Sequence, residues 1–360
     1  MTVSIDELQR TREPVEEADS DSDWSTIGET KLVTMTTMRW YTGWLAALWM
    51  LSTLGCVMAP YQYGRFERIP GEPEKPSEVA VDYGTPNKTL DRIGWVVGLP
   101  SRIFPLHAGV NNHHVSDETR DAVVKYLEEN DLTDVCIRIN QYDPKDEWRR
   151  LRRNRRMAAG WRYTGGVFCH LHYTLFPGRI VGGDWYNPYT NSLYINSDVQ
   201  ALVLHEAAYA KDIHSRRYPG TYSAINHVPL LWLWRQTVCV NDILSYAQME
   251  ENWEVEKQTY HVVYPLIGAH TGMSVSPLAP FGFEPVLGLG GALVGHATGR
   301  TVSALRAAEL RDRDSEPPID LDIRRDRKNN VVGSETEDND TPRDVGVTAL
   351  LGSVPPKVHE

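Results

Sequence analysis

The sequence predicts an α+β protein, because segments with the periodicity of a helix alternate with short segments with the periodicity of a strand. Residues 114–130 place apolar side chains three and four positions apart, whereas residues 134–142 alternate apolar and polar side chains. A helix, two strands and a further helix are then predicted up to residue 212. The chain has 360 residues, of which 41% are hydrophobic, so it can bury a substantial core. We expect several helices and a short mixed sheet.

The first helix and the first strand have clear boundaries. Ser116 is the predicted N-cap of the helix, which buries Val123 and Leu127 at helical spacing. In the strand that follows, the apolar side chains of Val135, Ile137 and Ile139 point to one side, so we expect a half-buried strand.

Residues 145–195 are expected to form one helix and two strands. The helix covers 145–156, and strands over 165–176 and 178–195 are separated by a Pro-Gly step. On the first of these strands His170 and His172 would face the same side, where they could bind a metal. The interpretation we favour is that both are exposed or hydrogen-bonded imidazoles.

The C-terminal third is predicted to be helical and then disordered. Residues 230–268 contain hardly any Pro or Gly and favour two packed helices. Residues 284–308 form a predicted helix with a ladder of glycines four residues apart, and its apolar part, 286–297, is too short to span a bilayer. We expect that helix to be buried or to lie on a membrane surface, and 309–360 to be a disordered tail.

An apolar run over 43–59, flanked by Trp and Tyr, is the clearest targeting signal in the chain. If translation starts at Met1, residues 1–38 are a disordered acidic tail and 39–60 a transmembrane anchor. If it starts at Met35 or Met38, the same segment resembles a short signal peptide that ends at Cys56. Either way, the main domain is expected to be exported, on the periplasmic or cell-envelope side, and held at the membrane.

Residues 61–92 are rich in Pro, Gly and charge and are predicted to be a linker, which places the main domain at 93–283. The net charge of −11 gives no general attraction for nucleic acid, and we interpret the basic stretch 149–156 as a solvated helix face. There is also no glycine-rich phosphate loop. The expected partners are a membrane and a protein or peptide, with no nucleic acid and no nucleotide.

The stretch LVLHEAAYAKD, residues 202–212, resembles the HExxH motif with one ligand replaced. In that motif two histidines on one helix face bind zinc, and the glutamate between them activates a metal-bound water. Here His205 and Glu206 are present, but Tyr209 stands in the position of the second histidine. A tyrosine could bind only as a phenolate, which is costly at neutral pH.

A third ligand is expected from a later helix. In gluzincins this ligand is a glutamate, and the matching position in LWRQTVCVNDILSY is Gln236. A neutral amide is a poorer zinc ligand than a carboxylate. Two of the three ligand positions, 209 and 236, are therefore replaced.

The segments RYTGG, YTLFPGR, GGDWYNPYTNSLYINSD, LHEAAYAKD and LWRQTVCVNDILSY together resemble bacterial membrane-associated zincin-like proteins of the gluzincin type. The resemblance covers about residues 100–300 and implies a zincin-like fold. It identifies His205 with the first ligand, Glu206 with the catalytic base, and Tyr209 and Gln236 with the lost ligands. It also matches Asp212 and the Asn241-Asp242 pair with positions that orient ligand side chains.

The function we expect is a non-catalytic, membrane-tethered protein that binds a partner or serves as a scaffold, with no cofactor. The alternative is a zinc metallopeptidase with variant ligation, in which Glu206 is the general base. A purely architectural role in the membrane, based on the glycine ladder, is a third possibility.

Overall fold

The computed structural model describes residues 60–67, 74–85, 88–181, 183–228, 231–276 and 282–315. Residues up to Arg300 belong to one compact unit, and the described residues beyond it complete the last helix. The elements in chain order are β1 (Ala80–Tyr83), α2 (Lys88–Val97), α3 (Leu99–Ile103), α4 (Asp117–Glu129), β2 (Cys136–Ile139), α5 (Pro144–Arg153), α6 (Ala159–Trp161), the π-helical turn η2 (Arg162–Gly166), α7 (Val167–Leu175), α8 (Gly178–Val181), β3 (Trp185–Asn187), β4 (Ser192–Ile195), α9 (Gln200–Ser215), α10 (Pro219–Ile225), α11 (Trp232–Met249), α12 (Trp253–Gln258), the π-helical turn η3 (Thr259–Val263), α13 (Tyr264–Ser274) and α14 (Glu284–Ser315).

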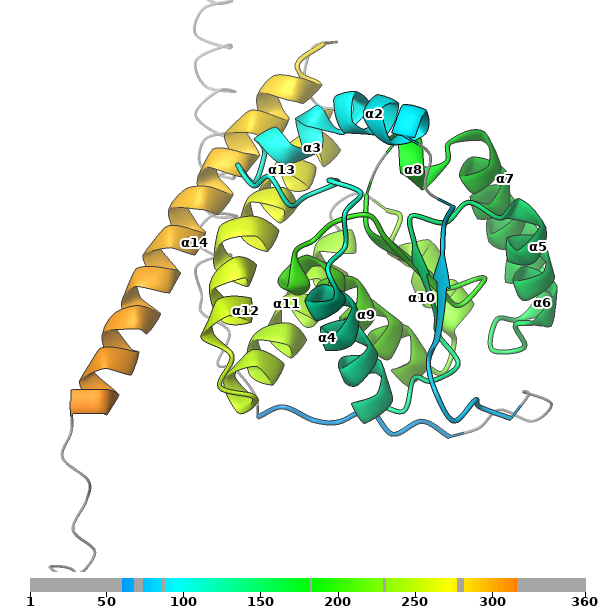
Figure 1. Cartoon of the computed structure of the whole chain (residues 1–360), viewed down its shortest axis with the longest axis horizontal. Helices are drawn as coiled ribbons and strands as arrows, with labels where there is room; N and C mark the ends of the chain where they lie inside the picture. Colours follow the sequence, from blue (N-terminus) through cyan, green and yellow to red (C-terminus); the bar gives the residue numbers. More distant parts are fainter. Residues whose placement is uncertain are drawn as a thin grey trace, which may run out of the picture. The chain divides into compact units, whose positions relative to one another are not determined.

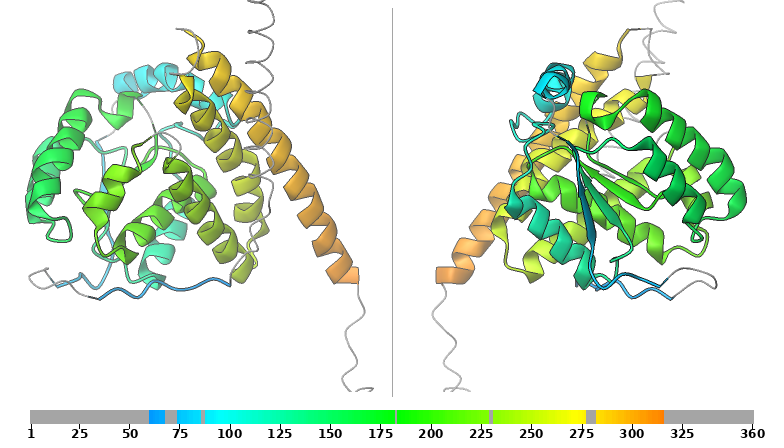
Figure 2. Two further views of the ribbon diagram at one scale, coloured as in Figure 1. Left: turned by 180° about the vertical axis from the view of Figure 1, so that it is seen from behind. Right: turned by 45° about the vertical axis from the view of Figure 1, so that its right-hand side comes forward.

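A four-stranded mixed sheet with the order β1-β2-β4-β3 lies at the centre of the first unit. Strands β1, β2 and β4 are parallel, and β3 pairs antiparallel with β4 at the sheet edge. Helices α4 and α9 lie on one side of the sheet and α5 to α7 on the other (Figures 1 and 2). The predicted α+β class with a short mixed sheet is confirmed.

The helix and strand predicted first are present, with one correction. Helix α4 begins after Ser116, whose side chain accepts a hydrogen bond from the Thr119 backbone N–H. Strand β2, however, is buried along its whole length, so the prediction of a half-buried strand is wrong. Helices cover both faces of this parallel strand, as is usual for parallel sheets.

The polar side chain that β2 buries is compensated by α5. The Arg138 side chain is fully buried, and its Nε lies 2.9 Å from Glu147 Oε1. Asp146 also pairs with Arg138, and the Ser192 hydroxyl donates to Glu147 at 2.9 Å. An ion pair with additional hydrogen bonds replaces the hydration that these charges lose.

The strand predicted over 165–176 is wrong, because this segment forms the end of η2 and helix α7. His170 and His172 therefore do not share a strand face, and Trp148 lies against the His170 ring. A short apolar run is compatible with either structure, and the tertiary contacts decide. Gly166 is one of these contacts, since an added Cβ would lie 2.5 Å from Leu151 Cδ1.

The predicted linker over 61–92 is wrong in two places. Residues 80–83 form β1, which pairs with β2, and α2 begins at Lys88. The segment after Pro60 is also fixed, because the Tyr61 hydroxyl and the Gly64 backbone N–H both donate to Asn130 Oδ1 at 2.8 Å. The Pro and Gly content favoured a linker, but strand pairing orders residues 80–83 and the Asn130 side chain holds Tyr61 and Gly64.

The glycine ladder packs α14 against α13. A Cβ on Gly291 would lie 2.0 Å from the Gly268 carbonyl oxygen, and one on Gly295 would lie 2.5 Å from that of Tyr264. Only glycine allows backbones to approach this closely. Helix α14 continues to Ser315, so the disordered tail does not start at 309 as predicted. Arg306 and Glu309 form an i,i+3 ion pair of 2.8 Å in that last part of the helix.

Among the described residues, no helix has both the length and the apolar character needed to cross a bilayer. The apolar run 43–59, the predicted tail 1–38 and residues 316–360 lie outside the described residues. The anchor therefore stays a prediction from the sequence.

Neighbouring glycines of α14 provide a matched test of the α13–α14 contact. Gly291→Ala is expected to lower the free energy of unfolding by about 2 kcal/mol, because its Cβ meets the backbone of α13. Gly290→Ala meets nothing within 4 Å and should raise it by up to about 1 kcal/mol through helix propensity. Urea unfolding followed by circular dichroism measures both, and equal effects would contradict the close packing.

The buried ion pair of β2 and α5 gives a second prediction. Arg138→Met leaves the Glu147 carboxylate buried without its cation and should cost about 3–5 kcal/mol of unfolding free energy. Arg149→Met removes an exposed arginine of α5 and should change stability by less than about 1 kcal/mol. Urea titrations of the two variants distinguish a required ion pair from a general loss of positive charge.

Candidate active site

Helix α9 carries the residues of the predicted motif into the interior. It is enclosed by α4, α10, α11, α12 and the strands β3 and β4, and most of its side chains are buried. Residues 205, 206 and 209 are each less than a tenth exposed. When a helix is buried on nearly all sides, each of its polar side chains needs a hydrogen-bond partner within the protein.

Glu206 receives partners from its own helix and from the sheet edge. The His205 Nδ1 lies 3.1 Å from Glu206 Oε1, and the backbone N–H of Tyr186 on β3 donates to Oε2 at 3.2 Å. Because a carboxylate only accepts, the proton of the neutral imidazole is on Nδ1. The Nε2 of His205 is then an acceptor and faces away from Glu206.

That acceptor is used by Gln236 of α11. In the amide orientation that gives both of its groups a partner, the Gln236 nitrogen donates to His205 Nε2 at 2.8 Å. The Gln236 oxygen then accepts from Arg235 Nη2 at 2.7 Å. The lone pair with which this histidine would bind a metal is occupied by an amide N–H.

The guanidinium of Arg235 provides the positive charge of the site. It lies 4.0 Å from Glu206 Oε1, and its Cζ lies 4.3 Å from the centroid of the Tyr209 ring. Burial alone would raise the pKa of Glu206, but the His205 hydrogen bond and the Arg235 charge lower it. Burial raises the pKa of Tyr209 despite the nearby Arg235, so its hydroxyl stays protonated.

These contacts do not fit a bound zinc ion. Zinc needs unprotonated ligands that converge on one point, and a cation beside that point repels the metal. Here an amide N–H is directed at His205, the tyrosine is protonated, and a guanidinium lies against both Tyr209 and Glu206. Within the described part of the chain, no three His, Cys, Asp or Glu side chains form a group that could hold a metal.

The structure brings together four residues that the sequence singled out, namely His205, Glu206, Tyr209 and Gln236. Their expected roles as ligands and base stay predictions. Sequence reasoning missed Arg235, although it is the neighbour of Gln236, because an arginine has no place in a metal-ligand pattern. It also missed the backbone N–H of Tyr186, for which the sequence carries no signal.

The carboxylates expected to orient ligands pair with basic side chains. Asp212 pairs with Arg216, one turn further along α9. Asp242 accepts from Lys211 Nζ at 2.6 Å and from the Tyr126 hydroxyl. The role of Asp212 and Asp242 in orienting metal ligands stays a prediction.

A scan of protein-family models and searches of curated proteins and of solved structures gave no match to this chain. The resemblance to zincin-like proteins therefore rests on the residues of the motif.

The charge of Arg235 can be tested through the pH dependence of stability. A carboxyl whose pKa is lowered by folding stabilises the protein above its unfolded pKa, and this contribution is lost as the pH falls. Arg235→Leu removes the cation and should cost about 2 kcal/mol at pH 7 but less at pH 3, because the Glu206 carboxyl loses its charge only as the pH falls through its lowered pKa. Urea unfolding at the two pH values measures this.

Arg235→Lys is the matched control, because it keeps the charge but loses the planar fork. It should show a smaller cost at pH 7 than Arg235→Leu. If the cost of Arg235→Leu is the same at both pH values, the guanidinium does not compensate the Glu206 charge.

Proposed function

We propose that this protein is a membrane-tethered, non-catalytic member of the zincin-like type, which binds a protein or peptide partner at the cell envelope. The observation that carries the proposal is the contact of Gln236 and Arg235 with His205, Glu206 and Tyr209. An amide and a guanidinium contact the side chains that a zinc enzyme directs at its metal. The site is thus a closed polar network and not an open coordination sphere.

The arrangement of β3 and α9 supports the zincin-like part of the proposal. In the zincin-like arrangement that the motif implies, an edge strand runs beside the active-site helix. Here β3 is the antiparallel edge strand, and its Tyr186 N–H donates to Glu206 of α9. The edge group that could pair with a peptide backbone is used internally at this position.

The same contacts support the non-catalytic part of the proposal. A general base must reach a water or a substrate, whereas both Glu206 oxygens already accept hydrogen bonds and face a cation. The contacts of the Glu206 carboxylate are structural, because they join α9 to β3 and to α11. A binding role is left for the exterior of the domain.

Zinc content is the direct test. The native chain is expected to contain no stoichiometric zinc by elemental analysis, and a chelator should not change its melting temperature. Tyr209→His/Gln236→Glu should still take up little zinc, because Arg235 remains beside the restored ligands. Adding Arg235→Leu to those two changes should allow one zinc per chain, with a melting temperature that a chelator lowers.

Two results would contradict the proposal. Stoichiometric zinc in the native chain would show that the site coordinates metal with variant ligands. Chelator-sensitive cleavage of a peptide library that Glu206→Gln abolishes would establish the alternative, a zinc metallopeptidase with Glu206 as general base.

A further inference from the structure

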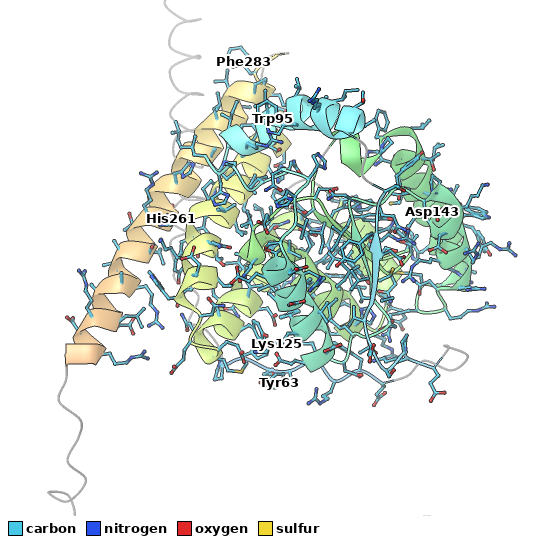
Figure 3. The ribbon with its side chains drawn as sticks, viewed as in Figure 1. Tyr63, Trp95, Lys125, Asp143, His261 and Phe283 are labelled. Atoms are coloured by element: carbon cyan, nitrogen blue, oxygen red, sulfur yellow. The ribbon has the colours of Figure 1, made fainter. Side chains whose placement is uncertain are left out.

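Helices α5 and α7 pack side by side along one edge of the first unit, which we call the α5–α7 face (Figures 1 and 3). The Trp148 ring of α5 contacts the His170 ring of α7, with centroids 5.3 Å apart. The Tyr142 hydroxyl before α5 donates to the Thr174 carbonyl at 2.8 Å. The side chains that point outward from these two helices therefore form one continuous surface.

The outer side of α7 is apolar. Phe168, Leu171 and Leu175 follow each other at helical spacing and are 71%, 52% and 62% exposed, and Phe176 is 52% exposed. Three large apolar side chains in solvent on a helix of nine residues, with a fourth directly after it, are unusual for a free surface. The inner side of this short helix buries Tyr173 instead.

The part of the α5–α7 face beside these apolar side chains is strongly basic. Residues 148–183 contain no Asp or Glu but eight arginines, in a chain with a net charge of −11. Arg149, Arg152, Arg153 and Arg155 are exposed. Of the two acidic residues within α5, Glu147 is buried against Arg138, and Asp146 is shared between Arg138 and the exposed Arg149. The internal ion pair thus leaves the outer side of α5 positive.

We propose that the α5–α7 face binds the surface of a membrane that contains anionic lipids. A surface-bound amphipathic element places Phe and Leu among the acyl chains and Arg or Lys beside the anionic headgroups, which is the division seen between α7 and α5. The long arginine side chains can reach the headgroups while their methylenes cover apolar surface.

Two other occupants fit this face less well. A symmetric dimer would place the arginines of α5 against those of a second copy, and like charges repel. Nucleic acid would match the arginines but would leave Leu171 and Leu175 against phosphates, since only aromatic rings stack on bases. The charge pattern and the aliphatic stripe together favour an anionic bilayer.

The inference rests on the proposed tether only in one respect, namely that the tether holds the face near lipid. A single weak surface contact is marginal alone and becomes effective beside a second membrane signal. The apolar run 43–59 ends one residue before the described chain begins and would provide that second signal.

The test places a photo-crosslinking phenylalanine analogue at position 168 of the full chain, mixed with phosphatidylcholine vesicles with or without phosphatidylglycerol. After illumination, mass spectrometry identifies what is attached to the peptide. The expected product is a lipid adduct that requires phosphatidylglycerol. The same analogue at Tyr83, which is 58% exposed on β1, should give at least ten-fold less lipid adduct.

Charge variants test the role of the arginines. Each basic side chain at an anionic surface is worth roughly five-fold in affinity. Arg152→Gln/Arg153→Gln should therefore lower the adduct yield at limiting anionic lipid by roughly ten-fold or more. Arg311→Gln/Arg313→Gln makes the same change of charge at exposed positions of α14 and should leave the yield unchanged.

The outcomes separate the face from the tether. Adducts at position 168 to a second copy, to the acidic termini of the chain or to no lipid at all would overturn the proposal, as would equal adducts at position 83. Flotation of the vesicles reports the tether independently, because a chain that floats without a lipid adduct at 168 is tethered but does not use this face.

Discussion

The buried carboxylate of Glu206 is the constraint on which the centre of this structure depends. An uncompensated buried charge costs several kcal/mol, so the fold must bring partners to it. They come from three elements, namely His205 on α9, the Tyr186 backbone on β3 and Arg235 on α11. The position of the edge strand and that of the later helix are thereby linked to one side chain. In a zinc enzyme the metal provides the positive charge; here a guanidinium does.

Helix α4 and the HEAAY motif could be predicted from the sequence because their signals are local. The period of α4, its Ser116 cap and the HEAAY pattern each depend on residues within one element. The nearness of Gln236 to His205 was expected from the resemblance to gluzincins, which take a ligand from a later helix. The sequence could not predict the partner of each buried group, because Arg235, Tyr186 and Asn130 contact residues that are distant in the sequence. The prediction of a strand at α7 failed because this apolar run contains no local feature that separates a helix from a strand.

The distribution of charge connects the core of the domain to its surface. Arg138 lies within a fully buried strand, pairs with the buried Glu147 of α5 and shares Asp146 with Arg149. The exposed Arg152 and Arg153 then give the outer side of α5 a positive charge, although the chain as a whole is acidic. The buried ion pair therefore has a second effect, which is to draw acidic groups away from the α5–α7 face.

The attachment of the N-terminal segment gives that face a fixed direction. Lys211 of α9 donates to the Gln62 carbonyl at 2.6 Å and lies 4.0 Å from the centroid of the Tyr61 ring. Asn130, which caps the C-terminal end of α4, accepts hydrogen bonds from Tyr61 and Gly64. Residues 61–64 are thus attached to the folded domain, whereas a linker over 61–92 would have let the domain turn freely. With that freedom removed, the fold itself sets how the α5–α7 face is oriented relative to Pro60, the first described residue.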